Sequence, residues 1–530
     1  MGLWAKSVAI FNSLCGNRAQ SLRQVAHLNG FSKSSVHRLK QSMERRDRHP
    51  ESWLWETDEG HQWLRRLVAA TLYTFGLKRG VGAESIGEFF VRLRLERHVG
   101  CSPSALRTVM DALERLILET AAAWEKEGIA HGEIRPVIGA VDETFLQRMM
   151  LVFMDLCSGY LLMEEVAADR GFETWYDRAN DRLKTLGTAV LYLVSDRAKA
   201  LIKLAQTGLG CLSIPDVFHL SHDLAKGSSL ASFGRLRQAK QTLAHAKQRL
   251  ETLQKNAQAE HGHIEQAQAL VAESETSVNH WQGVRRTWKA HLSNVSRILH
   301  PWRLADSSRQ TSQEVEEQLR AELQALERLL KTNGLPMKKD TLDKVGKQLA
   351  GLSALVDFWW QTVRQDMAQM AMTPRWTTWV EDSLLPLMYW QEKLRRTRCR
   401  VQKAQIALVL QAMEDAFERH ACTRQLQPEV LASWKAWAGD HARAFQRASS
   451  AVEGRNGSLS QMQHNHRGLP MGRYLVWTVL HNFDCRAADG TTPASRFFRR
   501  SFPDLFESVL SQVDELPIPR QRRQAIAVSD

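Results

Sequence analysis

Apolar and polar positions between residues 135 and 226 follow the pattern of a β-sheet crossed by helices. Short apolar runs bounded by turn residues are typical of buried strands. Cys157-Ser158-Gly159 predicts a hairpin between the second and third runs, and helical spacing predicts helices over residues 173–186 and 197–207. The five expected strands cover residues 137–141, 151–156, 160–167, 189–194 and 211–219. This order predicts a mixed sheet, part antiparallel and part parallel, covered by helices.

Residues 227–440 instead carry the three-four apolar spacing of long helices. Two such helices, separated by a break at residues 261–263, predict a coiled-coil hairpin. The apolar positions of this hairpin are Leu243, Ala246, Leu250, Leu253, Ala257, Ile264, Ala267 and Val271. A capping box at residues 311–314 predicts a third helix that ends at Asn333-Gly334, and further helices are expected over residues 349–370 and 379–418. The hairpin is interpreted either as a dimerisation surface or as a brace within one subunit.

Tryptophans gather in the same all-helical stretch. Because Trp is mainly a large buried side chain, we expect most of them to pack in the interior. One or two are candidates for stacking on an unpaired or flipped base. The residues concerned are Trp281, Trp288, Trp302, Trp359, Trp360, Trp376, Trp379 and Trp390.

The first 50 residues predict a helix-turn-helix. Residues 21–28 form a short amphipathic helix, Asn29-Gly30-Phe31 a turn, and Ser32 caps a second helix. The expected small core is Leu22, Val25, Ala26, Phe31, Val36 and Leu39. The outward positions carry the short polar and basic groups that a recognition helix uses on DNA, namely Lys33, Ser34, Ser35, His37, Arg38 and Lys40. An ordinary helical hairpin is the alternative interpretation.

Residues 51–132 are expected to be helical and contain a second basic unit. Helices are predicted over residues 83–95 and 105–119, with Ser102-Pro103 as the cap of the second. A second DNA-binding unit and a basic, solvated helix face are both compatible with this pattern. Its basic residues are Arg92, Arg94, Arg97 and Arg107.

Charge and composition narrow the classes of function. The 530 residues include 71 Lys and Arg against 58 Asp and Glu, a net charge of +13 with a pI near 9.5. This excess favours a polyanionic partner such as nucleic acid. The 7 cysteines are scattered without a CxxC pair, which argues for a reducing compartment and against a zinc site. No apolar run reaches the length of a membrane span and no signal-peptide core is present, so we expect a cytoplasmic, nucleoid-associated protein with no membrane partner.

Three acidic residues stand where a divalent cation could be held. Asp142 and Asp196 each end an expected buried strand, and Glu453 lies early in an expected helix. The end of a buried strand holds a side chain rigidly at the rim of a sheet. Carboxylate oxygens are the ligands that Mg²⁺ and Mn²⁺ prefer. The three acids therefore predict a metal-dependent reaction at a phosphodiester.

The residues around these acids resemble those of DDE transposases of the RNase H-like superfamily, the group behind many bacterial insertion sequences. They are VIGAVDETF at Asp142, LYLVSDRAK at Asp196, SSAVEGRNG at Glu453 and the closing DGTTPASRFF. The 257-residue interval from Asp196 to Glu453 (453 − 196) is similar to families in which a helical domain interrupts the fold before its last acid. The resemblance implies an RNase H-like catalytic core in which all three acids are catalytic ligands of Mg²⁺, with Mn²⁺ as a substitute.

The same resemblance implies an activity and its partners. The protein would bind double-stranded DNA at element ends and at the target, and would catalyse cleavage and strand transfer in DNA transposition. One large group of such transposases places a Tyr and an Arg before the Glu and a Lys beyond it, where this chain has Ser449 and Ser460 among the matching positions. We expect Arg455 and Asn456 to contact phosphate in their place.

Other acidic and imidazole groups near the expected strands are alternative candidates for site residues. Glu143 is an alternative ligand, but side chains alternate along a strand, so it is expected to face away from Asp142. His219 is a candidate near-site residue, with a hydrogen-bonded structural histidine as the alternative. The remaining acids of the hairpin are interpreted as solvent-facing or edge charges; they are Asp155, Glu164 and Glu165.

The expected fold class is therefore α/β: an RNase H-like mixed sheet with an N-terminal helix-turn-helix and a large all-α insertion. A DDE transposase acting as a homo-oligomer is the leading hypothesis. A non-catalytic DNA-binding regulator of the same fold, or an RNase H-like nuclease without strand transfer, are the alternatives. The expected domains are residues 1–50 (helix-turn-helix), 51–132 (helical), 133–226 (first part of the core), 227–440 (insertion), 441–512 (last part of the core) and 513–530 (basic tail).

Overall fold

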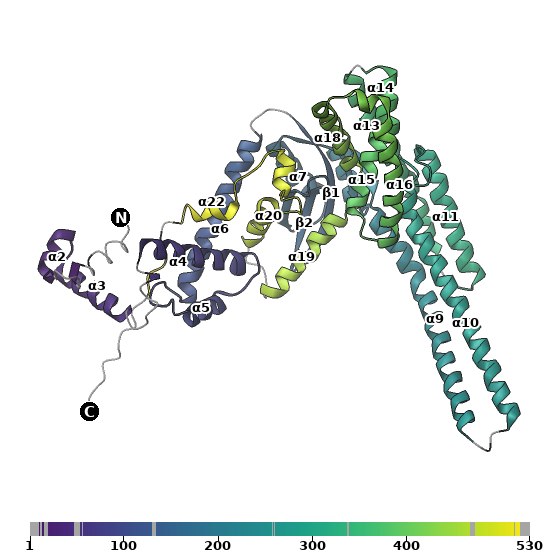
Figure 1. Ribbon diagram of the computed structural model, residues 1–530, viewed down its shortest axis with the longest axis horizontal. Helices are drawn as coiled ribbons and strands as arrows, with labels where there is room; N and C mark the ends of the chain where they lie inside the picture. The colour runs from purple at the N-terminus through teal and green to yellow at the C-terminus, as the bar shows by residue number, and fades with distance from the viewer. Residues whose placement is uncertain are drawn as a thin grey trace.

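The computed structural model describes residues 10, 13–14, 20–46, 54–55, 57–129, 134–256, 258, 260–336, 339–370, 372–466, 472–513 and 515–519. Helices make up most of this part of the chain, and a five-stranded sheet lies within the body of the molecule (Figure 1). The expected combination of a mixed sheet with a large helical part is confirmed. Within these ranges, no helix is both long and apolar enough to cross a membrane. The basic residues of the tail from 520 onward fall outside them.

The sheet has the strand order β3-β2-β1-β4-β5. Its members are β1 (Arg135–Leu146), β2 (Arg148–Asp155), β3 (Leu161–Ala167), β4 (Thr188–Ser195) and β5 (Leu212–Pro215). Neighbours β1, β2 and β3 pair antiparallel, whereas β4 pairs parallel with both β1 and β5. The predicted hairpin is also present, since Gly159 at φ 76° turns the chain between β2 and β3. The predicted order of strands and helices along the chain and the mixed directions of the strands are thus confirmed.

Two strands differ in length from the prediction. β1 does not end at Asp142 but continues to Leu146, because its pairing with β2 runs on to Leu146↔Arg148 after its pairing with β4 stops at Ala140↔Val194. Asp142 therefore lies within a strand, just beyond the point where β4 leaves it. β5 is shorter than expected, because Asp216 follows Pro215 as the cap of a helix.

Helices cover both faces of the sheet. On one face lie α19 (Ser450–His466) and α20 (Arg473–Asp484), and on the other lies α7 (Phe172–Leu186), which ends at Gly187 as predicted. The side chains show which face each helix covers, because Arg455 of α19 reaches Glu164 while Arg178 of α7 reaches the neighbouring Glu165. Adjacent residues on a strand point to opposite faces.

The helices before the sheet share its hydrophobic core. They are α4 (Asp58–Thr71), η2 (Leu72–Leu77), α5 (Ala83–Arg92) and α6 (Pro103–Ile129). One cluster of buried side chains continues from Leu64 to Val513, and α6 packs against α20 and against α22 (Leu505–Leu510). The closing α21 (Pro493–Phe498) begins at a capping box on Thr492. After β4 the chain forms α8 (Lys199–Lys203) and η3 (Leu204–Gly208).

The insertion is all-helical, as predicted. Its members are α9 (Val217–Lys255), α10 (His261–Ile298), α11 (Ser312–Thr332), α12 (Lys339–Gly346), α13 (Leu349–Gln369), α14 (Pro374–Trp379), η4 (Val380–Leu384), α15 (Leu385–Arg396), α16 (Arg400–Arg419), α17 (Ala421–Gln425) and α18 (Pro428–Ala444).

The capping box on Thr311 is confirmed, and the helix expected over residues 379–418 is instead divided into several. The hairpin turn precedes His261, rather than lying at residues 261–263. The expected domain edges at 226/227 and 440/441 fall inside α9 and α18.

Most of the insertion's tryptophans are packing residues, as predicted. Trp302, Trp359 and Trp360 are buried and meet edge to face, with ring centroids 5.0–5.3 Å apart. Trp288, Trp379 and Trp390 are also buried, whereas Trp281 and Trp376 are half-buried.

At the N-terminus, α2 (Leu22–Asn29) and α3 (Lys33–Arg46) form a pair of short helices apart from the main core (Figure 1). A capping box on Ser21 opens α2, Gly30 at φ 68° ends it, and the Ser32 hydroxyl accepts from the amide of Ser35. The predicted small core is confirmed in full and also includes Ile10 and Leu14.

Candidate active site

Asp142 and Glu453 come together where β1 meets α19. Glu453 lies in the first turn of α19, and Asn456, nearly one turn further along, donates its Nδ2 to Asp142 Oδ2 over 2.8 Å. The amide of Glu143 donates to Asp142 Oδ1 over 2.9 Å. Burial raises the pKa of Asp142 to about 7, and the charge of Glu453 adds to the rise. The two carboxylates are therefore close enough to repel each other.

His219 links Glu453 to a second, fully buried acid. Its Nδ1 lies 2.8 Å from Asp216 Oδ2 and its Nε2 lies 3.3 Å from Glu453 Oε1. Asp216 also caps α9 through the amide of Phe218, and accepts the hydroxyl of Ser449. The hydrogen bond with Asp216 is the main cause that raises the pKa of His219 to about 9, and the charges of Asp216, Glu453 and Asp142 add to it. The imidazolium form, which donates from both nitrogens, is thus favoured at neutral pH.

Asp196, the third predicted ligand, has a hydrogen-bond partner of its own. It is exposed just after β4, and its Oδ1 accepts the amide of Ala198 over 2.9 Å. Its charge instead acts on Glu143, whose pKa is raised first by burial and then by Asp196. In the part of the chain that the structure describes, no three His, Cys, Asp or Glu side chains are gathered so as to hold a metal ion. Of the three predicted ligands, the structure brings together Asp142 and Glu453 but not Asp196.

The sheet register separates Glu143 from Asp142. Asp142 stands opposite Val152, which stands opposite Glu164, so these positions share the face that α19 covers. Glu143 stands in the neighbouring row with Glu165, on the face that α7 covers. The alternation that predicted Glu143 to face away from Asp142 is therefore observed.

Two predictions about charged residues on this face are wrong. Arg455 does not offer its guanidinium to a phosphate: its side chain is 5% exposed and pairs with Glu164, which is 0% exposed, through bonds of 2.7 and 2.8 Å. Thr478 donates to the same carboxylate. Glu164 is thus not an edge charge, and neither is Asp155, which is buried and accepts the amides of Ile138 and Ser158. Both acids are retained in the interior because hydrogen bonds and a cation satisfy them.

Asn456, the other expected phosphate contact, is 9% exposed and faces Asp142. Its Oδ1 is buried and has no hydrogen-bond partner among the described residues. This placement makes Asn456 a neighbour of the acids rather than a surface group.

The residues predicted to contact DNA in the N-terminal helix pair lie on the outside of α3. Lys33, Ser34, His37 and Arg38 are exposed, and Ser35 and Lys40 are half-buried. In the second basic unit, Arg92 pairs with Glu88 and Arg107 with Glu84. These ion pairs favour the interpretation of that unit as a solvated helix face.

The metal that the resemblance implies was tested against the groups present. Asp142 and Glu453 fit a divalent cation, because both offer oxygen atoms and their mutual repulsion would be relieved by positive charge between them. The orphaned Oδ1 of Asn456 lies beside them. Asp196 does not complete this set in the arrangement observed. His219 occupies one oxygen of Glu453 with a cationic partner of the protein's own.

Sequence reasoning missed Asp216 and Ser449 as parts of this site. The signal for Asp216 was local, since an acid at a helix cap with a histidine three residues on places both side chains on one turn. Ser449 carried no such signal, because its contact with Asp216 joins residues 233 positions apart.

Comparison with known proteins adds one match. Residues 380–525 match the model of a family described as a family of unknown function, DUF6399. This part includes Glu453 and Asn456 but not Asp142, Asp196 or His219. No curated protein matches the chain.

Proposed function

We propose that this protein is a DDE-type transposase, which binds DNA and catalyses Mg²⁺-dependent phosphodiester cleavage and strand transfer. The observation that carries the proposal is the meeting of Asp142 and Glu453 across β1 and α19, with the pKa of Asp142 raised to about 7. A carboxylate whose pKa is strongly raised by burial and by a neighbouring acid marks a site where ionisation costs stability, and such carboxylates are enriched at functional sites.

The fold supports the proposal. Three antiparallel strands followed by two parallel crossovers, in the order β3-β2-β1-β4-β5, form the kind of sheet that the RNase H-like resemblance implies. The helical stretch from α9 to α18 separates this sheet from the acidic helix α19, as the resemblance also implies. The exposed polar residues of α3 support recognition of DNA by the N-terminal helix pair.

Asp142 and Glu453 would hold the cation, with Asp196 as the expected third ligand. A bound Mg²⁺ would supply charge stabilisation for the phosphodiester and lower the pKa of an attacking water. Asn456 orients Asp142 through its amide, and His219, fixed by Asp216, orients Glu453. The buried pair of Arg455 with Glu164 holds α19 in register on the sheet. No covalent protein–DNA intermediate is needed, so no Ser or Tyr nucleophile is assigned.

One observation favours a second candidate. A DNA-binding regulator that keeps the fold does not require its acids to converge, and in the described part of the chain Asp196 is not gathered with Asp142 and Glu453 into a set of three ligands. An RNase H-like nuclease without strand transfer would use the same two acids.

The test is Mg²⁺-dependent cleavage of a DNA fragment that carries the flanking element end. Wild type is expected to cleave and join it, and Asp142→Asn to lose at least about 10³-fold in rate while DNA binding survives. Glu165→Gln, on the opposite face of the same sheet, is the matched control and should retain activity. Binding without cleavage by the wild type, with Mg²⁺ and Mn²⁺ alike, would favour the regulator instead.

A further inference from the structure

α9 and α10 pair with each other along an apolar seam whose spacing alternates between three and four residues. On α9 the seam is Leu236, Ala239, Leu243, Ala246, Leu250 and Leu253, and on α10 it is Ile264, Ala267, Val271, Ser274, Val278 and Trp281. We call residues 235–281 the arm; it projects away from the rest of the molecule (Figure 1). Because the apolar positions of the two helices pack against each other within one chain, they are not exposed to bind a second copy of the chain. The arm therefore fits the expected brace within one subunit, and its function must lie on its outer surface.

The outer surface of the arm has its charges sorted by helix. On residues 235–255 of α9, one anion, Glu251, stands among the cations Arg235, Arg237, Lys240, Lys247, Arg249 and Lys255. On α10, residues 260–281 carry no Lys or Arg, and the acids are Glu260, Glu265, Glu273 and Glu275. Like charges repeated along one helix repel each other. The α9 side of the arm is thus a strongly basic strip.

Only part of this strip is neutralised by the protein. Lys247 pairs with Glu275 and Lys255 with Glu251. The other cations on the α9 part of the arm are exposed and form no ion pair with any residue in the described ranges; they are Arg235, Arg237, Lys240 and Arg249. These unpaired cations are free to meet an anion from outside.

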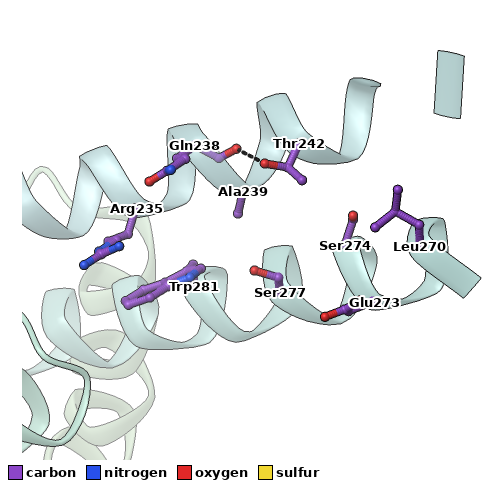
Figure 2. A pocket seen from close by; sticks show the side chains of 9 residues that line it. All are labelled: Arg235, Gln238, Ala239, Thr242, Leu270, Glu273, Ser274, Ser277 and Trp281. Carbon is purple, nitrogen blue, oxygen red and sulfur yellow. Dashed lines mark hydrogen bonds between the residues drawn. The ribbon is translucent and has the colours of Figure 1, made fainter. Parts of the chain in front are cut away.

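The flank of the arm that bears Arg235 is hollowed rather than flat. A hollow of about 320 Å³ opens there between the two helices, with small residues at its base (Figure 2). Arg235 and Trp281 stand at one end of it, and Gln238, Thr242 and Ser277 line it with amide and hydroxyl groups, while Glu273 of α10 contributes the one carboxylate of its lining. A second hollow further along includes Arg249. Arginine, amide and hydroxyl groups are those that contact phosphate oxygens and sugars in protein–DNA interfaces.

We propose that the α9 side of the arm binds the phosphate backbone of double-stranded DNA without regard to sequence. This inference rests on the proposed function, in that DNA is the polyanion the protein would hold. A second copy of the chain, docking its acidic α10 on the basic α9, is the competing occupant. The outer faces disfavour it, because Leu270 is the one exposed large apolar residue on the described part of the arm, and stable interfaces between copies need an apolar centre.

The continuity of α9 sets the distance between the arm and the acids. The helix begins at Val217, so His219, which touches Glu453, and the α9 side of the arm belong to one continuous helix, along which the DNA is proposed to run. At about 1.5 Å per residue, Arg235 lies ~24 Å and Arg249 ~45 Å along the helix from His219. At ~3.4 Å per base pair, the arm would meet DNA roughly 7 to 13 base pairs from the scissile phosphate.

The experiment compares two double variants that remove the same charge from the same helix. Arg235→Gln/Arg249→Gln removes unpaired cations, and Lys247→Gln/Lys255→Gln removes cations already paired with glutamates. The full-length proteins are titrated with a fluorescent duplex of arbitrary sequence, about 50 base pairs long, across about 50–200 mM KCl. The slope of log K, the association constant for DNA, against log salt concentration is negative. Its magnitude is expected to decrease by about 2 for the double arginine variant and to stay near the wild-type value for the double lysine variant.

Three outcomes decide the inference. Equal slopes for the two doubles would overturn it, even if Asp142-dependent cleavage is observed. Equal slopes together with an altered sedimentation coefficient of the arginine double in the absence of DNA would assign the strip to a second copy. A slope of smaller magnitude for the arginine double alone supports the inference, and it does so even if the wild type never cleaves, in which case the proposed catalysis fails and the DNA-binding arm stands.

Discussion

Glu164 and Asp142 lie in the same row of the sheet and contact the same helix, α19, but the helix places a cation beside Glu164 and a neutral side chain beside Asp142. Above Glu164, α19 places Arg455, and the pair is closed off from solvent with Thr478 as a third partner. Above Asp142, one residue further along α19, it places the neutral Asn456, with Glu453 close by. The carboxylate of Glu164 is neutralised by Arg455, whereas the carboxylate of Asp142 has the like charge of Glu453 nearby.

This contrast separates a structural group from a functional one. A buried ion pair with all its oxygens satisfied fixes the register of α19 on the sheet. A carboxylate whose pKa is raised by burial and by a neighbouring acid is a cost to the folded state, and such costs persist at functional sites. Substitutions at Arg455, beside Glu164, and at Asp142 test this contrast.

The largest effect is expected from Arg455→Met. It would leave Glu164 buried without its cation, so the free energy of unfolding should fall by about 3–5 kcal/mol, seen as a thermal midpoint lowered by roughly 10 °C. Arg178→Met, which breaks the half-exposed pair with Glu165 on the opposite face, is the control and should cost about 1 kcal/mol or less. Circular dichroism melts compare them. Equal losses would show that the two pairs do not differ in kind.

The features that sequence reasoning predicted well are those set by neighbours along the chain. The core of the N-terminal helix pair, the capping box on Thr311 and the stop of α7 at Gly187 each depend on residues within a few positions of one another. Turn chemistry and apolar period carry that information locally. The order of the strands along the chain is also predictable, because each strand has its own apolar run.

The features that it missed depend on distant partners. Arg455 was expected at a phosphate because nothing near it in sequence shows that Glu164, 291 positions away, lies beneath it. The strand at Asp142 was ended too early, because residues 143–146 look polar until β2 is seen to pair with them. Asp142 and Glu453 are predicted to share a site from their chemistry and from a resemblance, but the packing of α19 against β1 that brings them together has no signal in the sequence near either residue.

A second prediction concerns Asp142→Asn in metal-free buffer. The folded-state pKa of about 7 lies above the ordinary 3.8, so ionisation destabilises the fold as pH rises from about 4 through 7. The variant should therefore match the wild type near pH 4 and be more stable at pH 8, by about 1–2 kcal/mol after allowance for partial exposure. Glu165→Gln is the control and should lack this gain. A variant no more stable at pH 8 than at pH 4 would contradict the role of Asp142 as a repelled acid.

Magnesium should compensate the same repulsion. If Asp142 and Glu453 hold Mg²⁺, the cation at ten times its dissociation constant should stabilise the wild type by about 1.4 kcal/mol. The gain should be larger at pH 8 than at pH 6, because protons on Asp142 compete with the metal. Asp142→Asn should lose most of the shift in thermal midpoint, and Arg178→Met should keep it. A shift that is equal in wild type and Asp142→Asn would place the bound metal elsewhere.

The smallest effect is expected at His219, which is the only cation the protein itself sets against Glu453 in the described part of the site. Its pKa of about 9 lies above the ordinary 6.5, so its charge stabilises the fold fully below about pH 6.5, and that contribution is lost as pH rises through 9. His219→Gln should therefore be less stable than wild type by about 1 kcal/mol at pH 6, since a third of the side chain is exposed. The difference should fade by pH 10. His222→Gln, an exposed histidine on the same helix, is the control, and thermal melts in metal-free buffer at both pH values supply the measurement. A pH-independent loss for His219→Gln would mean that the imidazole acts through packing and not as a counter-charge to Glu453.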